Sequence, residues 1–122
     1  MSLSNSQFDA IMRTYQQQQL QNRHEQESRI AEVYNKIPAI KELDDSISSC
    51  AVKSARRLLD GDQGALKELR AEIADLREQK GVLLRAYGFT PDYMEMHYKC
   101  TDCMDTGYSE GRKCHCFRQA EM

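Results

Sequence analysis

The apolar residues between positions 4 and 37 recur three or four residues apart, and this stretch contains no Gly or Pro. That spacing predicts one long helix, for which Ser4, Asn5 or Ser6 can serve as the N-cap. The polar sequence QQQQLQNRHEQE interrupts the apolar pattern, and we expect it to be a solvated part of the same helix. The apolar positions are Phe8, Ile11, Met12, Tyr15, Ile30, Val33, Tyr34 and Ile37.

A second interpretation of the first apolar group is that it contacts a partner. The polar interruption separates this group from the later one, so the first turns of the helix can project and dock another protein. The candidate partner-binding residues are Phe8, Ile11, Met12 and Tyr15.

A second helical segment begins at Pro38, because proline suits the first turn of a helix and disfavours helical geometry at the residue before it. The sequence DGDQG, from Asp60 to Gly64, ends this helix in a tight turn. Cys50 lies on the apolar stripe and is interpreted as a small buried side chain rather than a metal ligand. The stripe consists of Ile40, Leu43, Ile47, Cys50, Ala51, Leu58 and Leu59.

The third helical segment has the apolar spacing of a coiled-coil seam. Lys80 occupies one seam position, where its aliphatic stem can cover apolar surface while the ammonium reaches water. Gly88 fits the position just after the helix, and Pro91 lies shortly beyond it. The apolar seam residues are Leu66, Leu69, Ile73, Leu76, Leu83 and Tyr87.

The composition narrows the classes of function. Hydrophobic residues make up 40% of the 122 positions and charged residues 30%, which suits elongated helices with narrow apolar stripes. The formal net charge of −2 excludes a global basic field that would attract nucleic acid. The apolar runs are too short to span a membrane, and the first residues, MSLSNSQFD, do not resemble a secretory signal. We therefore expect a cytoplasmic protein, in which clustered thiols more often bind metal than form disulfides.

Four of the five cysteines fall within residues 100–116, as C-x2-C, ten residues, then C-x-C. A C-x2-C turn directs two sulfurs toward one centre. The glycines of MDTGYSEGRK predict a short hairpin, with SEGR as its turn, that returns the second pair beside the first. In an extended segment the C-x-C side chains share a face, and a bend is needed to bring both sulfurs to one ion. The predicted ligands of a structural Zn²⁺ are Cys100, Cys103, Cys114 and Cys116.

Other chemistries remain open for this segment. His115 or His97 can replace one thiolate in a mixed site. A thiol-redox site is a further alternative, although C-x2-C oxidoreductase motifs are expected in a βαβ setting, which the pattern of this chain lacks. Direct nucleic-acid binding would use Arg112 and Lys113 at the hairpin, but nearby acidic residues and a negative tetrathiolate centre offset their charge.

These patterns predict a mainly α fold class: an elongated antiparallel helical hairpin or three-helix bundle, followed by a small C-terminal four-cysteine zinc hairpin. We divide the chain into a coiled-coil-like helical adaptor domain, residues 1–90, and a zinc-binding module with the start of a further helix, residues 91–122. The sequence FTPDYMEMHY is expected to join them as an ordered linker or a short strand. The seam of the third helix can pair within the chain or between chains, so a homo-oligomer is a possible assembly.

The motifs of common enzymes are missing from the sequence, which has no phosphate-binding G-x4-G-K-[ST] loop, no G-x-G-x2-G and no Ser/His/Asp set. Four thiolates would also close the coordination shell of an ion and leave no position for a substrate. Asp44 and Asp45 lie early in a helix, where the dipole favours negative charge, and His24 is expected in solvent. We therefore expect no enzyme activity and no catalytic residues in this chain.

The cysteine segment resembles a known family. It reads Y-x-C-x2-C-x-D-T-G-Y, then a short hairpin, then G-x2-C-x-C-F, after a polar helical region rich in Gln, Glu and Lys. This order resembles the N-terminal region of bacterial DnaC/DnaI-type replicative helicase loaders, which are ATP-binding primosomal proteins. The residues that carry the resemblance are Tyr98, Cys100, Cys103, Asp105, Thr106, Gly107, Tyr108, Gly111, Cys114, Cys116 and Phe117.

The resemblance implies that the chain is the adaptor region that binds the replicative DNA helicase in DNA replication, with a structural zinc site. In the family, a C-terminal AAA+ ATPase domain binds ATP and Mg²⁺ and makes the contacts to single-stranded DNA. That domain is expected beyond Met122, because the sequence CFRQAEM reads as the start of an interrupted helix.

A second resemblance is to the DksA/TraR type of regulators that bind RNA polymerase, in which a helical hairpin also carries a four-cysteine zinc finger. Those proteins use C-x2-C at both ends and acidic residues at the tip of the coiled coil. This chain has C-x-C at its second pair, with Asp60 and Asp62 at the tip. A stand-alone DNA-binding zinc module is the third alternative.

Overall fold

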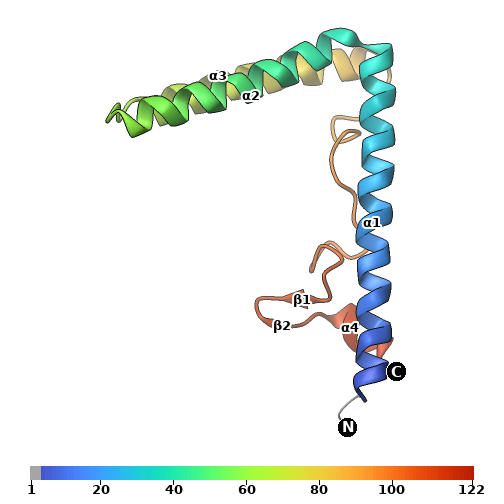
Figure 1. The fold of residues 1–122 in the computed structure, drawn as a ribbon. Helices are drawn as coiled ribbons and strands as arrows, with labels where there is room; N and C mark the ends of the chain where they lie inside the picture. The colour runs from blue at the N-terminus through green and yellow to red at the C-terminus, as the bar shows by residue number, and fades with distance from the viewer. Residues whose placement is uncertain (1–3) are drawn as a thin grey trace. The chain divides into compact units, whose positions relative to one another are not determined.

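The computed structural model describes residues 4–122, and the chain is mainly helical over this range, as the sequence predicts (Figure 1). The elements in chain order are α1 (Asn5–Lys36), α2 (Pro38–Leu59), α3 (Ala65–Ala86), β1 (Tyr108–Ser109), β2 (Arg112–Lys113) and α4 (His115–Ala120). Residues 1–3 of the predicted N-terminal domain lie outside the described range. No helix in the described range is long and apolar enough to cross a membrane.

The start of α1 is fixed by a reciprocal cap at Ser4. The Ser4 hydroxyl accepts a hydrogen bond from the Gln7 amide at 3.2 Å, and the Gln7 side-chain oxygen accepts one from the Ser4 amide at 3.0 Å. This pairing is a capping box, which satisfies two amides that the helix leaves free. Of the three candidate caps, Ser4 is therefore the residue that caps α1, and the helix continues through the polar stretch as predicted.

Only Ile37 separates α1 from α2. Its backbone leaves helical geometry (φ −132°, ψ 77°), its amide donates to the Val33 carbonyl at 2.7 Å, and its side chain is buried. Pro38 then occupies the first turn of α2, as its fixed φ favours. The sharp change of direction is therefore encoded by two residues, the buried Ile37 and the proline after it.

The helices α2 and α3 lie side by side, and the turn between them is held by side chains (Figure 1). Arg57 contacts the Asp62 carboxylate at 2.6 Å and the Glu68 carboxylate at 2.7 Å. Asp62 also accepts a hydrogen bond from the Gly64 amide at 3.0 Å. The apolar stripe does not reach this turn, because Leu58 and Leu59 are exposed and Ser54 is the buried residue nearest to it on α2.

The compact part formed by Arg29–Met94 has its apolar core where α1 ends, α2 begins and α3 ends. Gly88 (φ +84°) ends α3 as predicted, and the Phe89 amide donates to the Leu84 carbonyl at 2.9 Å, which is a Schellman arrangement. The core consists of Val33, Ile37, Ile40, Leu84 and Met94, with Ile30, Tyr34, Leu83, Phe89 and Tyr93 packed against it.

The segment FTPDYMEMHY is ordered without forming a strand. Arg29 donates a hydrogen bond to the Tyr93 carbonyl at 2.9 Å, and the Tyr93 hydroxyl donates to the Glu32 carboxylate. The Phe89 and Tyr93 rings pack with their centroids 4.8 Å apart. Of the two alternatives, an ordered linker describes the segment and a short strand is wrong.

The seam residue Lys80 makes an ion pair rather than only reaching water. Its ammonium lies 2.8 Å from Asp44, and the Tyr34 hydroxyl donates to the other oxygen of the same carboxylate at 2.6 Å. Burial, and then the hydrogen bond with Asp44, raise the pKa of Tyr34. Asp44 therefore links three helices of this core, a role beyond that of a charge at a helix start.

The remaining described residues, 4–28 and Glu95–Met122, form a second compact unit. The sequence predicts a division of the chain after residue 90, whereas the contacts group the first part of α1 with the cysteine segment. The cysteines and the residues that surround them all belong to this unit.

Candidate metal centre

The first cysteine pair lies on a tight loop that is organised by Asp105. Its carboxylate accepts hydrogen bonds from the Cys100 amide at 2.8 Å and the Lys99 amide at 2.9 Å, and the side chain is buried. Met104 and Asp105 both have positive φ, near 57°, a region that residues other than Gly enter at some cost. The carboxylate stabilises this backbone, so Asp105 shapes the loop that presents Cys100 and Cys103.

The pKa of Asp105 reflects two opposing effects, burial and the hydrogen bonds to its carboxylate. Burial by itself raises the pKa, but the hydrogen bonds from the Cys100 and Lys99 amides, and then from Asn22, bring it below the ordinary value. The ionised form is therefore the one that the surroundings are arranged to bind.

The hairpin returns the second cysteine pair to the first, as the sequence predicts. Strands β1 and β2 pair antiparallel, with Tyr108 opposite Lys113. Glu110 and Gly111 form the two-residue turn, both with positive φ, in keeping with the predicted turn at SEGR. The Cys114 amide donates to the Gly107 carbonyl at 2.8 Å, so the hydrogen bonding of the hairpin extends as far as Cys114, a predicted metal ligand.

The C-x-C pair straddles the start of α4. Cys114 is extended (φ −69°, ψ 158°) and is the N-cap of α4, while Cys116 lies in the first helical turn. The bend that the spacing requires is therefore the helix start itself. The sequence predicts a bend at this pair and, from CFRQAEM, the start of a helix, and the structure shows that the helix start provides the bend.

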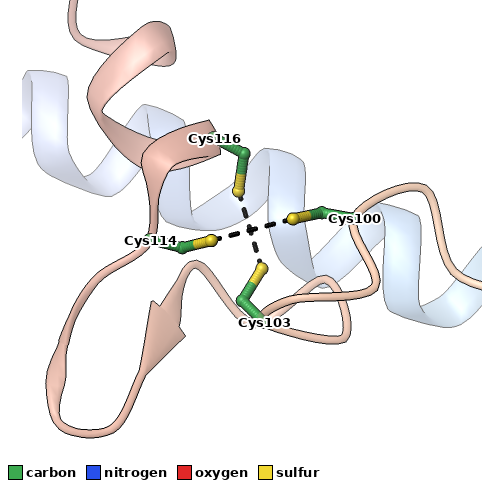
Figure 2. A group of neighbouring side chains, drawn as sticks. All are labelled: Cys100, Cys103, Cys114 and Cys116. Atoms are coloured by element: carbon green, nitrogen blue, oxygen red, sulfur yellow. Dashed lines mark hydrogen bonds between the residues drawn. The ribbon is translucent and has the colours of Figure 1, made fainter.

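The four sulfurs converge on one point (Figure 2). The Sγ atoms of Cys100 and Cys114 lie 3.7 Å apart, those of Cys103 and Cys116 lie 3.5 Å apart, and all four lie within 4.8 Å of one another. A tetrahedral ion with bonds of about 2.3 Å to sulfur needs sulfur–sulfur separations of about 3.8 Å. A disulfide needs about 2.05 Å, and all five cysteines of the chain are free thiols. The cluster could therefore hold a metal ion.

The electrostatics of the cluster also fit a cation. Burial and the neighbouring thiols raise the pKa of Cys116 to about 12, although the hydrogen bond from Tyr15 by itself lowers it. For Cys103, burial is outweighed by hydrogen bonds from the Gly107 amide and the other thiols, and its pKa is lowered to about 7. Four thiols at this separation cannot all ionise without a neutralising charge. A divalent cation supplies that charge, so the donor set fits a metal ion.

His115 belongs to a second group, with Asp102 and Cys100, and shares only Cys100 with the four-cysteine cluster. Its Nε2 lies 2.7 Å from Asp102 and 3.7 Å from the Cys100 sulfur, and the His115 and Asp102 side chains are exposed. Because the same nitrogen faces both neighbours, this is not the relay of a Cys-His-Asp nucleophile, which uses both ring nitrogens. Among the described residues, His97 and Cys50 belong to neither group.

Two of the predicted partner-binding residues pack inside this unit. Phe117 is fully buried, and its ring lies 6.0 Å from that of Phe8 and 5.9 Å from that of Tyr15, centroid to centroid. Ile11 and Met12 are half-buried on the same stretch of α1. Ile11 and Tyr15 also line a cavity of about 500 Å³ that reaches Cys116.

The polar stretch of α1 supplies residues that sequence reasoning missed. Asn22 is buried and donates to the Asp105 carboxylate at 2.7 Å, and Gln19 donates to the Asp105 carbonyl at 2.8 Å. The expectation that this stretch is solvated is therefore wrong for Asn22. A signal was present, because Phe8, Tyr15 and Asn22 recur at intervals of seven residues and so lie on one face of a helix.

The fold and the site together define a mainly helical protein with a four-cysteine cluster that could hold a metal ion. No protein-family model matches the chain, and no significant match was found among curated proteins or solved structures.

Proposed function

We propose that the cysteine cluster is a structural zinc site and that the chain is the helicase-binding adaptor region of a replicative helicase loader. The observation that carries the proposal is the convergence of Cys100, Cys103, Cys114 and Cys116 within the segment that resembles that family. Tetrahedral sites with four sulfurs favour zinc or iron–sulfur centres. Zinc is preferred here because the C-x2-C loop and the hairpin resemble a zinc module.

The proposed zinc would stabilise structure rather than catalyse a reaction. Four thiolates fill the coordination shell, and the exposed His115 faces a carboxylate. The chain is accordingly proposed to be a cytoplasmic binding module. In the loader family, ATP and Mg²⁺ belong to the AAA+ domain, which also makes the contacts to single-stranded DNA.

Metal analysis of the purified chain tests the site. We expect about one zinc per chain, loss of that zinc in Cys103→Ser, and its retention in the control Cys50→Ser, because Cys50 lies on α2 outside the cluster. Full zinc content in Cys103→Ser, or iron in place of zinc, would overturn the four-thiolate zinc assignment.

The proposed helicase contact is the first part of α1, for which the sequence predicts Phe8, Ile11, Met12 and Tyr15 as the candidate residues. Because Phe8 and Tyr15 pack on Phe117, we assign the direct contact first to Ile11 and Met12. We further propose that α2 and α3 form the antiparallel hairpin of an elongated adaptor.

Capture of the cognate replicative helicase by the chain tests this contact. The double variant Ile11→Ser, Met12→Ser should lose most of the binding while keeping its zinc. The matched control is Leu20→Ser, an exposed apolar residue of the same helix, which should bind as the wild type does. Undiminished capture by the double variant would rule out this surface.

The polymerase-regulator alternative is favoured by one observation, the paired helices α2 and α3 with an acidic turn at their end. Asp62 in that turn is bound by Arg57 and the Gly64 amide, which leaves Asp60 as the more exposed carboxylate. Capture of RNA polymerase instead of the helicase, with loss of binding in Asp60→Asn, would favour this alternative.

A further inference from the structure

We propose that Tyr15 is a positioning residue of the metal centre, whose hydroxyl donates a hydrogen bond to the Cys116 thiolate and makes α1 part of the metal site. The inference rests on the proposed metal site. It gives Tyr15, which the sequence predicts to bind a partner, a role toward the bound ion.

The geometry places the Tyr15 hydroxyl directly on a ligand atom. Its Oη lies 2.9 Å from the Cys116 Sγ. A thiolate that binds a metal carries no proton and can only accept, so the hydroxyl is the donor.

The ring of Tyr15 is fixed in this orientation by its neighbours. It stacks on Phe117, the residue after Cys116, with an interplanar angle of 9°. On the adjoining side lies Gly107, where an added Cβ would come within 3.0 Å of both the Tyr15 and Phe117 rings. The hydroxyl is therefore aimed by packing, not only by its own hydrogen bond.

A second contact joins the same helix face to the other half of the cluster. Asn22 lies two helical turns beyond Tyr15 and donates to the Asp105 carboxylate, which in turn accepts from the Cys100 amide. Thus α1 contacts the Cys116 side through Tyr15 and the Cys100 loop through Asn22. Metal binding and the packing of this helix face should therefore strengthen each other, because such coupling is reciprocal.

The hydrogen bond has a defined electrostatic effect. Four thiolates around a divalent ion carry a net negative charge, and a donor on one sulfur withdraws part of it. The ligand–ligand repulsion falls, and the sulfur that accepts the bond becomes a weaker nucleophile. Hydrogen bonds from outside the coordination shell commonly change metal affinity by about 10–100-fold.

The variant Tyr15→Phe in the full chain tests the proposal, because it removes only the hydroxyl and keeps the ring on Phe117. Zinc affinity, measured by competition with a chelator, should fall about tenfold or more, and the sulfur-to-metal absorption band of the Co²⁺-substituted protein should shift. Tyr108→Phe is the matched control: its ring also packs on Phe117, at 5.6 Å, and both readouts should match the wild type.

A second measurement does not depend on comparing affinities. In the zinc-bound protein, alkylation of Cys116, mapped by mass spectrometry, should be several-fold faster in Tyr15→Phe than in the wild type, while Cys100 changes less. Wild-type affinity, absorption and alkylation in Tyr15→Phe would overturn the role of Tyr15 and leave the metal site standing. Failure of the wild-type chain to bind Zn²⁺ or Co²⁺ would overturn both.

Discussion

Gly107 lies where α1, the hairpin and α4 pack together, and two independent constraints act on it. Its φ of +86° is unfavourable for any residue with a side chain, and the space where a Cβ would lie is filled by the Phe117 and Tyr15 rings at 3.0 Å. Gly111 has a similar φ of +77°, but an added Cβ there would meet no atom of the described residues within 4 Å. The two glycines therefore separate backbone strain from steric overlap.

We predict that Gly107→Ala destabilises the protein more than Gly111→Ala does. Gly111→Ala should cost about 1 kcal/mol, from the positive φ alone. Gly107→Ala should lower the free energy of unfolding by about 1–3 kcal/mol more, because the Tyr15 and Phe117 rings must move. Urea unfolding of both variants, with the metal bound, measures the difference. Equal costs would show that the rings adjust freely around residue 107.

Residues that act through their own type and spacing were predictable, and residues that act through tertiary contacts were not. The cysteines, Gly88 and Pro38 take the places that their local chemistry assigns. Asn22 looked solvated because its sequence neighbours are polar, and its partner Asp105 lies far along the chain. The seven-residue spacing of Phe8, Tyr15 and Asn22 places Asn22 on the packed face, but nothing in the sequence identifies Asp105 as its partner.

At the scale of elements, the turn between α2 and α3 depends on an ionised side chain. The hydrogen bond from Arg57 is the largest cause that lowers the pKa of Asp62, and the Gly64 amide adds to it. A carboxyl whose pKa is lower in the folded state stabilises that state at pH values above its unfolded pKa of about 4. That contribution is lost as the pH falls through the lowered folded value.

We therefore predict that Asp62→Asn is less stable than the wild type at pH 7 and that the difference shrinks below about pH 4. Thermal unfolding monitored by circular dichroism at pH 7 and pH 3 measures it. Asp60→Asn, in the same turn, is the control and should have a smaller effect at pH 7. A difference that is the same at both pH values would contradict a role for the Asp62 charge.

Helix ends with strong local signals were predictable, as were the hairpin and the helical start at CFRQAEM, but the burial that stabilises α4 was not. Proline at the start of α2 and glycine after α3 fix those boundaries through backbone geometry alone. The six residues of α4 are too few to be stable in isolation. Their helical form depends on the burial of Phe117, which a periodic pattern does not reveal.

At the scale of the whole molecule, two compact units share α1. Residues 4–28 pack with Glu95–Met122, and Arg29–Met94 form their own core. The sequence divides the chain after residue 90, since local patterns cannot indicate that residues near position 15 contact those near position 116. The mainly helical character was predictable from the sequence, but the way in which the chain is partitioned was not.

Metal removal should act on one unit and spare the other. We predict that a chelator exposes the backbone amides of residues 5–28 and 95–122 to hydrogen exchange, because their packing depends on the cysteine cluster. The amides of α2 and α3 should keep their protection, since the apolar core of Arg29–Met94 contains none of the four cysteines. Exchange measured by mass spectrometry with and without chelator tests this, and uniform loss along the chain would contradict it.

The seven-residue interval between Tyr15 and Asn22 also limits how this chain can vary. Residues 16–21 are mostly exposed, so most substitutions there leave the packed face intact. An insertion of one residue would rotate the rest of α1 by about 100° and advance it by about 1.5 Å, and Asn22 could then no longer meet Asp105 while Tyr15 meets Cys116. Apart from Gln18 and Gln19, whose side chains donate to Asn22 and to the Asp105 carbonyl, this part of α1 should therefore tolerate changes of identity but not of length.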